Sequence, residues 1–156
     1  MGAMVAAIGV GAKNYYRLTK MVDRVSAKRR SAIMARVKTK NTGPELAVRR
    51  LLHGFGYRFR LHRSDLPGSP DLAFPGRKKV VFVHGCFWHG HNCRWGRLPK
   101  SKLRYWAPKI ESNRARDRAN ASALRRSGWR MSVVWQCELK KLPALKQKLV
   151  EFLGNR

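Results

Sequence analysis

The chain has 156 residues, which is enough for one domain with a real hydrophobic core and too few for two. Lysine and arginine number 35 against 8 acidic residues, and this formal charge of +27, interleaved with aromatic residues, favours a nucleic acid over a membrane as the partner. No apolar run approaches the roughly 20 residues that a membrane-spanning helix needs.

The first 20 residues are expected to form a disordered extension ahead of a single domain over residues 21–156. The apolar run Met4–Val10 is short, and no basic segment precedes it as one would in a signal peptide. Ser26 to Lys38 has the apolar spacing of a helix. The domain is therefore expected to begin with a helix.

A second helix is predicted from about Thr42 to Gly54. Thr42 and Glu45 have the spacing of a capping box, in which two side chains satisfy the free N–H groups of the first turn. The buried stripe of this helix is predicted to consist of four apolar residues, namely Leu46, Leu51, Leu52 and Phe55.

Three strands are predicted next along the chain. Residues 57–62 alternate apolar and basic side chains, as a half-buried strand does. A turn rich in proline and glycine then leads into a short strand over residues 71–74. After a second turn, Val80 to Val83 is unbroken in its apolar character, which indicates a central strand.

The C-terminal third continues this alternation of helices and strands. Residues 105–127 are mostly helical in pattern, and Gly128 is predicted to end that helix. Trp129 to Trp135 is predicted to be a strand, and Leu142 to Leu153 an amphipathic helix. Helices flanking a short mixed sheet make the predicted fold class α/β.

The loop after the predicted central strand carries soft metal ligands. Gly85 to Cys93 holds two of the three cysteines and two of the five histidines. Three cysteines cannot close a disulfide framework, so metal binding in a reducing compartment is favoured over disulfides. Cys86, Cys93 and the distant Cys137 would complete a structural zinc site with either His89 or His91, unless the thiols are simply buried and reduced.

A second group of residues suggests phosphodiester cleavage. Asp71 opens a strand after a proline-bearing turn, and His84 and His89 flank the end of the next strand. In one nuclease superfamily a Pro-Asp pair meets an acidic-x-Lys signature on the neighbouring strand, and here a histidine would have to replace that lysine. Asp71 as an ordinary turn-capping residue is the competing interpretation.

Four motifs occur in one order with matching spacings over about Arg30 to Leu139. They are Pro67-Gly68-Ser69-Pro70-Asp71, His84-Gly85-Cys86-Phe87-Trp88-His89, Gly128-Trp129-Arg130 and Val134-Trp135-Gln136-Cys137. Together they resemble the very short patch repair (Vsr) endonucleases. The resemblance implies a restriction-endonuclease-like core with structural Zn²⁺ and catalytic Mg²⁺, and an enzyme that nicks DNA on the 5′ side of the thymine in a T:G mismatch left by deaminated 5-methylcytosine.

Carried over by position, the resemblance implies a role for five residues. Asp71 would bind Mg²⁺, and Val83, where the family can have threonine, would add its backbone carbonyl. His89 would be the general base and His84 a second active-site histidine. Glu45 matches a helix glutamate near the active site, although its capping box explains it fully without catalysis.

The resemblance also implies the zinc ligands and the residues that wedge into DNA. Four positions match the zinc ligands of the family, and they are Cys86, His91, Cys93 and Cys137. Phe87, Trp88 and Trp106 match aromatic residues that insert into the base stack, a step that is easiest at a mispair. Core packing is the alternative explanation for all three aromatic residues.

The expected partner is double-stranded DNA that contains a mismatch, with a mismatch-repair protein as a candidate second partner. We expect a monomer in the bacterial cytoplasm, on the nucleoid and without membrane contact. Three other functions stay open: a nuclease of the same fold with another mismatch or flanking sequence, a non-catalytic zinc-containing DNA-binding module, and a basic ribosomal or RNA-associated protein.

Overall fold

The computed structural model describes residues 26, 29, 32, 35, 36, 38, 40–99 and 103–154. The chain divides into two compact units, residues 1–47 and 48–156, which are described separately. The expected extension over residues 1–20 and most of the predicted helix from Ser26 to Lys38 lie outside the described residues. Within that predicted helix, the described residues Arg29, Ala32 and Ala35 are helical.

Helix α3 (Gly43–Gly54) begins in the first unit and continues into the second. Thr42 Oγ1 accepts a hydrogen bond from the Glu45 N–H at 3.4 Å, as the capping box predicts. The Glu45 carboxylate reaches one residue further back than in the ideal box, because its Oε2 accepts from the Asn41 N–H at 2.9 Å. The predicted helix start is therefore confirmed.

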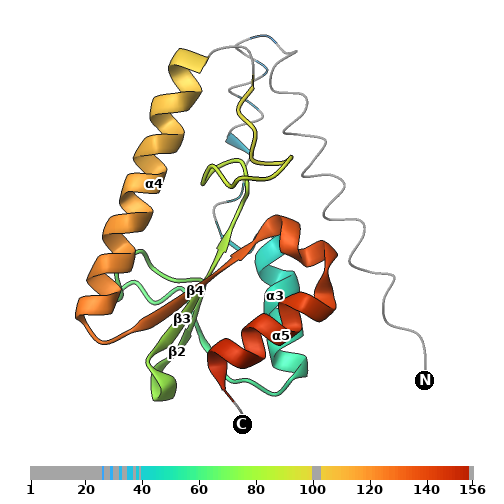
Figure 1. Ribbon diagram of the computed structural model, residues 1–156, viewed down its shortest axis with the longest axis vertical. Helices are drawn as coiled ribbons and strands as arrows, with labels where there is room; N and C mark the ends of the chain where they lie inside the picture. The colour runs from blue at the N-terminus through green and yellow to red at the C-terminus, as the bar shows by residue number, and fades with distance from the viewer. Residues whose placement is uncertain are drawn as a thin grey trace. The chain divides into compact units, whose positions relative to one another are not determined.

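The second unit contains a four-stranded mixed sheet in the order β1-β2-β3-β4 (Figure 1). Its strands are β1 (Arg60–Leu61), β2 (Leu72–Phe74), β3 (Lys79–His84) and β4 (Arg130–Trp135). β2 pairs antiparallel with both β1 and β3. β3 and β4 pair parallel, with helix α4 (Leu103–Arg126) as the crossover. β3 is paired on both sides, so the prediction of a central strand is confirmed.

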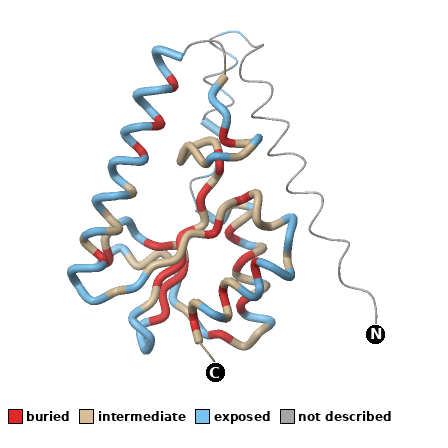
Figure 2. Tube along the Cα trace, viewed as in Figure 1, coloured by how far each residue is buried: buried red, intermediate tan, exposed pale blue. Residues whose placement is uncertain are grey.

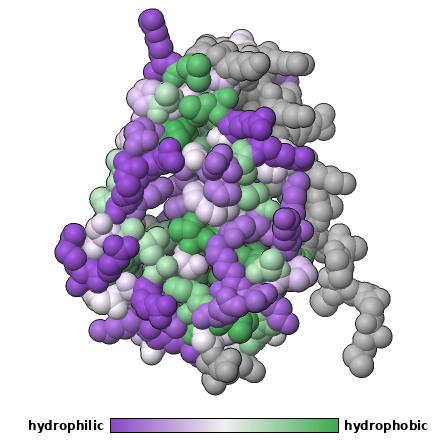
Figure 3. Space-filling view, viewed as in Figure 1, coloured by the Kyte–Doolittle hydropathy of each residue, from purple (hydrophilic) through white to green (hydrophobic). Residues whose placement is uncertain are grey.

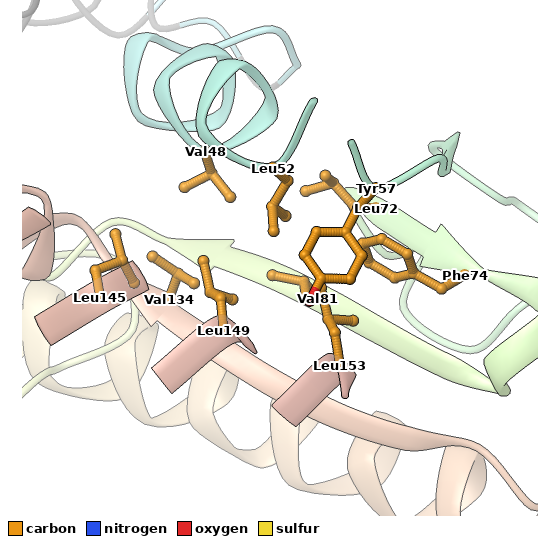
Figure 4. Packing of buried hydrophobic residues seen from close by; sticks show 10 residues of the cluster. All are labelled: Val48, Leu52, Tyr57, Leu72, Phe74, Val81, Val134, Leu145, Leu149 and Leu153. Carbon is orange, nitrogen blue, oxygen red and sulfur yellow. The ribbon is translucent and has the colours of Figure 1, made fainter. Parts of the chain in front are cut away.

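Helices cover both faces of this sheet (Figure 1). One face packs against α3 and α5 (Leu142–Leu153), and its core is shown in Figure 4. That core consists of Val48, Leu52, Tyr57, Leu72, Phe74, Val81, Val134, Leu145, Leu149 and Leu153. The other face packs against α4 through a smaller cluster of Leu66, Ala73, Val80, Phe82 and Leu124. Because successive strand residues point to opposite faces, β2 and β3 contribute to both cores.

Two sequence predictions about this core are wrong in detail. The strand predicted over residues 57–62 is only two residues long. Tyr57 and Phe59 instead turn their rings onto Phe74, and His62 has a φ of 47°, which an extended strand does not allow. On α3, Leu46 is 36% exposed, and Val48, one turn before Leu52, is fully buried instead.

The C-terminal elements follow the predicted pattern closely. α4 starts two residues earlier than predicted and contains Pro108 near its N-terminus. Gly128 ends the α4 turn with a φ of 77°, and the Trp129 N–H donates to the Leu124 carbonyl at 2.9 Å, which is a common helix C-cap. The 3-10 turn η4 (Gln136–Lys140) then links β4 to α5.

Burial is concentrated along the strands and on the inner side of each helix (Figure 2). Hydrophilic side chains cover much of the described surface on the face shown in Figure 3. Within the described part of the chain, no helix combines the length and the apolar character that a bilayer span requires.

Candidate functional site

The chemistry-bearing side chains of the second unit gather where β3 and β4 end. The two strands are parallel, and their last residues, His84 and Trp135, are register partners. The loop after β3 and the turn η4 after β4 therefore start from the same edge of the sheet. This explains how Cys137 reaches cysteines more than forty positions earlier in the chain.

Three thiols and one imidazole form the first cluster at this edge. The ligand atoms of Cys86, His91, Cys93 and Cys137 all lie within 4.8 Å of one another. Cys137 Sγ is 3.4 Å from His91 Nδ1. A tetrahedral zinc ion would set a sulfur and a nitrogen ligand about 3.6 Å apart, so these residues fit such an ion. The cluster could hold a metal ion, and its histidine is His91, whereas His89 lies in a separate group.

Tight backbone turns shape the loop that carries three of these ligands. The His91 N–H donates to the Cys86 carbonyl at 2.9 Å, and the Gly96 N–H donates to the Cys93 carbonyl at 3.0 Å. A Cβ atom at Gly96 would lie 1.9 Å from the His91 carbonyl oxygen, which no side chain can tolerate. The loop therefore closes around the ligands only because residue 96 is glycine.

An ion pair fixes the turn that carries the fourth ligand. Glu138 Oε2 accepts from the Trp135 N–H at 2.6 Å, and Glu138 Oε1 lies 2.8 Å from Lys148 Nζ. Lys148 also donates to the Val133 carbonyl at 2.7 Å. These contacts tie η4 to both β4 and α5, so Cys137 is held in place before any ion binds.

The thiols differ in acidity within the cluster. Burial raises the pKa of Cys86, and burial is also the main cause of the raised pKa of Cys137. The pKa of Cys93 is lowered: burial opposes this, but hydrogen bonds from the Trp95 N–H and from Cys86 outweigh it. Because thiolates are the ligands, an incoming metal ion would have to displace protons from this cluster.

A second cluster consists of two histidines and an aspartate from α4. His84 and His89 stack face to face, with ring centroids 3.7 Å apart and planes within 8°. His89 Nδ1 lies 2.5 Å from Asp117 Oδ2. Because a carboxylate only accepts, His89 Nδ1 carries a proton and Nε2 is the atom left to act as a base.

His84 is held neutral beside this pair. The pKa of His84 is lowered to about 4, mainly by burial and in part by the nearby His89, and Asp117 offsets some of this shift. His84 is only 8% exposed, and its ring meets the Trp135 ring edge to face, with the centroids 5.3 Å apart. Trp135 also stacks on His91 at 4.2 Å, so one indole ring contacts both clusters.

Asp117 is a residue that the sequence analysis missed. The buried residues of α4 are Trp106, Ile110, Asn113 and Leu124. Asp117 continues this stripe at helical spacing, and Asn113, one turn earlier, donates to the Trp88 carbonyl at 2.8 Å. An acidic residue on the buried stripe of a helix was the available signal.

Asp71 lies beside the end of β3. Its Oδ2 accepts a hydrogen bond from the Val83 N–H at 2.7 Å. The N–H and C=O of one strand residue point to the same side, so the Val83 carbonyl also faces the Asp71 side of the strand. A ring nitrogen of His62, another residue that the sequence analysis missed, lies within 4.8 Å of an Asp71 carboxylate oxygen. Carboxylate and carbonyl oxygens are the ligands that Mg²⁺ prefers, so this corner fits a hard cation.

Glu45 belongs to the first unit and is described there alone. It is 4% exposed, and its carboxylate is engaged by Thr42 and by the Asn41 N–H. These capping contacts give it a structural role, and a catalytic role stays a prediction.

The three aromatic residues predicted to wedge into DNA contact one another. The centroid of the Phe87 ring lies 5.1 Å from that of Trp88 and 5.0 Å from that of Trp106, and both contacts are edge to face. Trp106 is only 3% exposed, whereas Phe87 and Trp88 are half-buried. Phe87 and Trp88 are thus the accessible members of the cluster, and the buried Trp106 packs against both of their rings.

The chain is similar in sequence to known DNA endonucleases. The family model of the DNA mismatch endonuclease Vsr matches residues 22–95. The chain is 62% identical over 133 residues to the type II nicking enzyme V.XorIIP of Xanthomonas oryzae pv. oryzae, covering 85% of this chain and 98% of that protein. It is 40% identical over 129 residues to the type II nicking enzyme V.NmeAIP of Neisseria meningitidis (83% and 92% covered) and 39% identical over 129 residues to the DNA mismatch endonuclease Vsr of Escherichia coli (80% and 83% covered).

Proposed function

The chain belongs to the Vsr family of DNA mismatch endonucleases, and on that premise we propose that it nicks one DNA strand on the 5′ side of the thymine in a T:G mismatch, using Mg²⁺. Membership makes it a DNA-cleaving hydrolase. The observation that carries the finer proposal is the arrangement at one sheet edge of Asp71 against the Val83 N–H and of His89 against Asp117. The mixed sheet with helices on both faces supports a restriction-endonuclease-like core.

In this proposal His89 is the general base. The Asp117 carboxylate accepts a hydrogen bond from His89 Nδ1–H, so Nε2 is free of a proton and can take one from the attacking water. The carboxylate then stabilises the imidazolium that forms. The neutral His84 packs flat against the ring without adding a second positive charge beside it. His84 and Asp117 thereby fix both the orientation and the tautomer of His89.

Asp71 and the Val83 carbonyl are the proposed protein ligands of the catalytic cation. When bound there, Mg²⁺ would neutralise charge on the scissile phosphate and on the leaving oxygen. The Val83 N–H holds one Asp71 oxygen at 2.7 Å and so orients the carboxylate. Glu45 is proposed as a further active-site acid on the family resemblance alone.

The Cys86, His91, Cys93 and Cys137 cluster is proposed to bind a structural zinc ion. Its tetrahedral fit, and the absence of a position left open for a water among four protein ligands, favour a structural over a catalytic role. Phe87 and Trp88, backed by Trp106, are proposed to insert beside the mispair, where unstacking costs least. We expect the protein to act as a monomer on cytoplasmic DNA. A mismatch-repair protein is the proposed second partner, and pull-down experiments test that contact.

The test is strand-specific nicking of end-labelled duplexes that carry each mismatch in turn, with and without Mg²⁺. We expect Mg²⁺-dependent cleavage of the thymine strand at T:G and much less elsewhere. The Asp71→Asn variant should bind the duplex and keep its zinc but not nick it. Nicking of another mismatch in preference would support a nuclease of the same fold with a different target, and binding without any cleavage would support a non-catalytic module.

A further inference from the structure

An arginine–histidine pair lies beside the proposed cation site and has no part in the mechanism above. Arg49 of α3 places Nη2 at 2.8 Å from His62 Nε2. A His62 ring nitrogen in turn lies within 4.8 Å of an Asp71 carboxylate oxygen. All three residues are half-buried in the second unit. The pair therefore connects α3 to the residue on which the proposed metal chemistry depends.

The Arg49 contact decides where the His62 proton lies. A guanidinium group has only donors, so His62 Nε2 must accept and must offer its lone pair to Arg49. A neutral imidazole carries one proton, which then resides on Nδ1. His62 in this state is a hydrogen-bond donor on its Nδ1 side, with no lone pair left for a metal ion, even though a histidine beside a carboxylate is a common ligand pair.

The backbone at His62 indicates that the ring is placed at a conformational cost. His62 follows the last residue of β1 and has a φ of 47°, in the left-handed region. For a residue other than glycine this conformation is unfavourable, because Cβ comes too close to the following carbonyl oxygen. Such strain persists where surrounding contacts fix the residue, and it is frequent at functional sites.

We propose that Arg49 and His62 are positioning residues: Arg49 fixes the Nδ1–H tautomer of His62, which donates to the Asp71 carboxylate and orients it for the cation. Val83 N–H and His62 Nδ1–H then hold the carboxylate from two directions. The proposal deepens the proposed function and rests on Asp71 being a cation ligand.

The first experiment measures Mn²⁺ binding to the full-length protein by electron paramagnetic resonance, with Mn²⁺ as the probe in place of Mg²⁺. His62→Leu should weaken Mn²⁺ binding about 10- to 100-fold, as loss of a group that orients a metal ligand does. His62→Gln should restore most of the affinity, because its amide can both accept from Arg49 and donate to Asp71. His53→Leu, at an exposed histidine in the last turn of α3, is the matched control and should bind Mn²⁺ as the unchanged protein does.

The second experiment reads the His62 tautomer by ¹⁵N nuclear magnetic resonance. The Nδ1–H form is expected in the unchanged protein, and Arg49→Met should allow the Nε2–H form to appear. An Nε2–H tautomer in the unchanged protein, or tighter Mn²⁺ binding by Arg49→Met, would make His62 a direct ligand and overturn the proposal. Equal Mn²⁺ binding by His62→Leu would also overturn it.

Asp71→Asn separates this inference from the proposed function. If Asp71→Asn loses Mn²⁺ binding and His62→Leu does not, only the positioning role is lost. If Asp71→Asn itself binds Mn²⁺ normally, the proposed cation site fails, and the positioning role fails with it.

Discussion

Replacing Asp117 with asparagine tests the catalytic pair most directly. The carboxylate contacts His89 Nδ1 at 2.5 Å, and the two side chains are 25% and 22% exposed. When His89 takes a proton, its positive charge is centred about 4 Å from the carboxylate charge, and at an effective dielectric constant of about 20 this attraction is about 4 kcal/mol. Asparagine removes that charge, and its amide can turn an N–H toward Nδ1, which favours the tautomer with the proton on Nε2.

The expected result is a single-turnover nicking rate about 100- to 1000-fold lower, since 1.36 kcal/mol corresponds to a factor of ten and the ring is only partly charged in the transition state. The rate would be measured on a T:G duplex at saturating Mg²⁺ and enzyme. Duplex affinity and zinc content should stay unchanged. Glu111→Gln, which removes an exposed carboxylate of the same helix that pairs with Arg118, is the matched control. An Asp117→Asn variant that nicks at the control rate would refute the assignment of His89 as a base held by Asp117.

Three further predictions concern the metal loop and the DNA. Cys137→Ser should lower the zinc content measured by atomic absorption and should loosen the loop to proteolysis, because metal binding energy is folding energy in such sites; a variant that keeps one zinc per chain would contradict this. Gly96→Ala should have a similar effect although residue 96 is no ligand, since its Cβ would overlap the His91 carbonyl; normal zinc content would show that the loop can relax. Duplex affinity should fall with salt at a slope of about 0.9 per neutralised phosphate in a log–log plot, and an affinity independent of salt would exclude a phosphate-dominated interface.

Local patterns were sufficient to predict most of the elements. α5 begins and ends where the leucine spacing predicts, because a helix with one apolar stripe has a single way to bury it. β1 was predicted too long, because nothing in the alternation of residues 57–62 reveals that His62 turns the chain or that β2 offers so few partners. Leu46 and Val48 were misjudged on α3 because which residues of a stripe are fully covered depends on distant elements.

The candidate site was predictable to the extent that its chemistry is written in a contiguous motif. The composition of the loop around Cys86 indicates soft metal ligands. The position of Cys137 beside that loop follows once β3 and β4 are known to be parallel neighbours. Asp117 and His62 lie in no contiguous motif that indicates their chemistry. Each becomes informative only through a contact across the fold, with His89 in one case and with Arg49 in the other, and local spacing does not encode such contacts.

The parallel register of β3 and β4 has a consequence for how the protein would lose activity on heating. One ladder of hydrogen bonds aligns His84 with Trp135, and that indole touches an imidazole of each cluster. A slip of one residue would turn every side chain of β4 to the opposite face, so burial on both faces specifies this register strongly. The release of an ion bound to the cysteine cluster and the loss of cleavage should therefore share one cooperative melting transition.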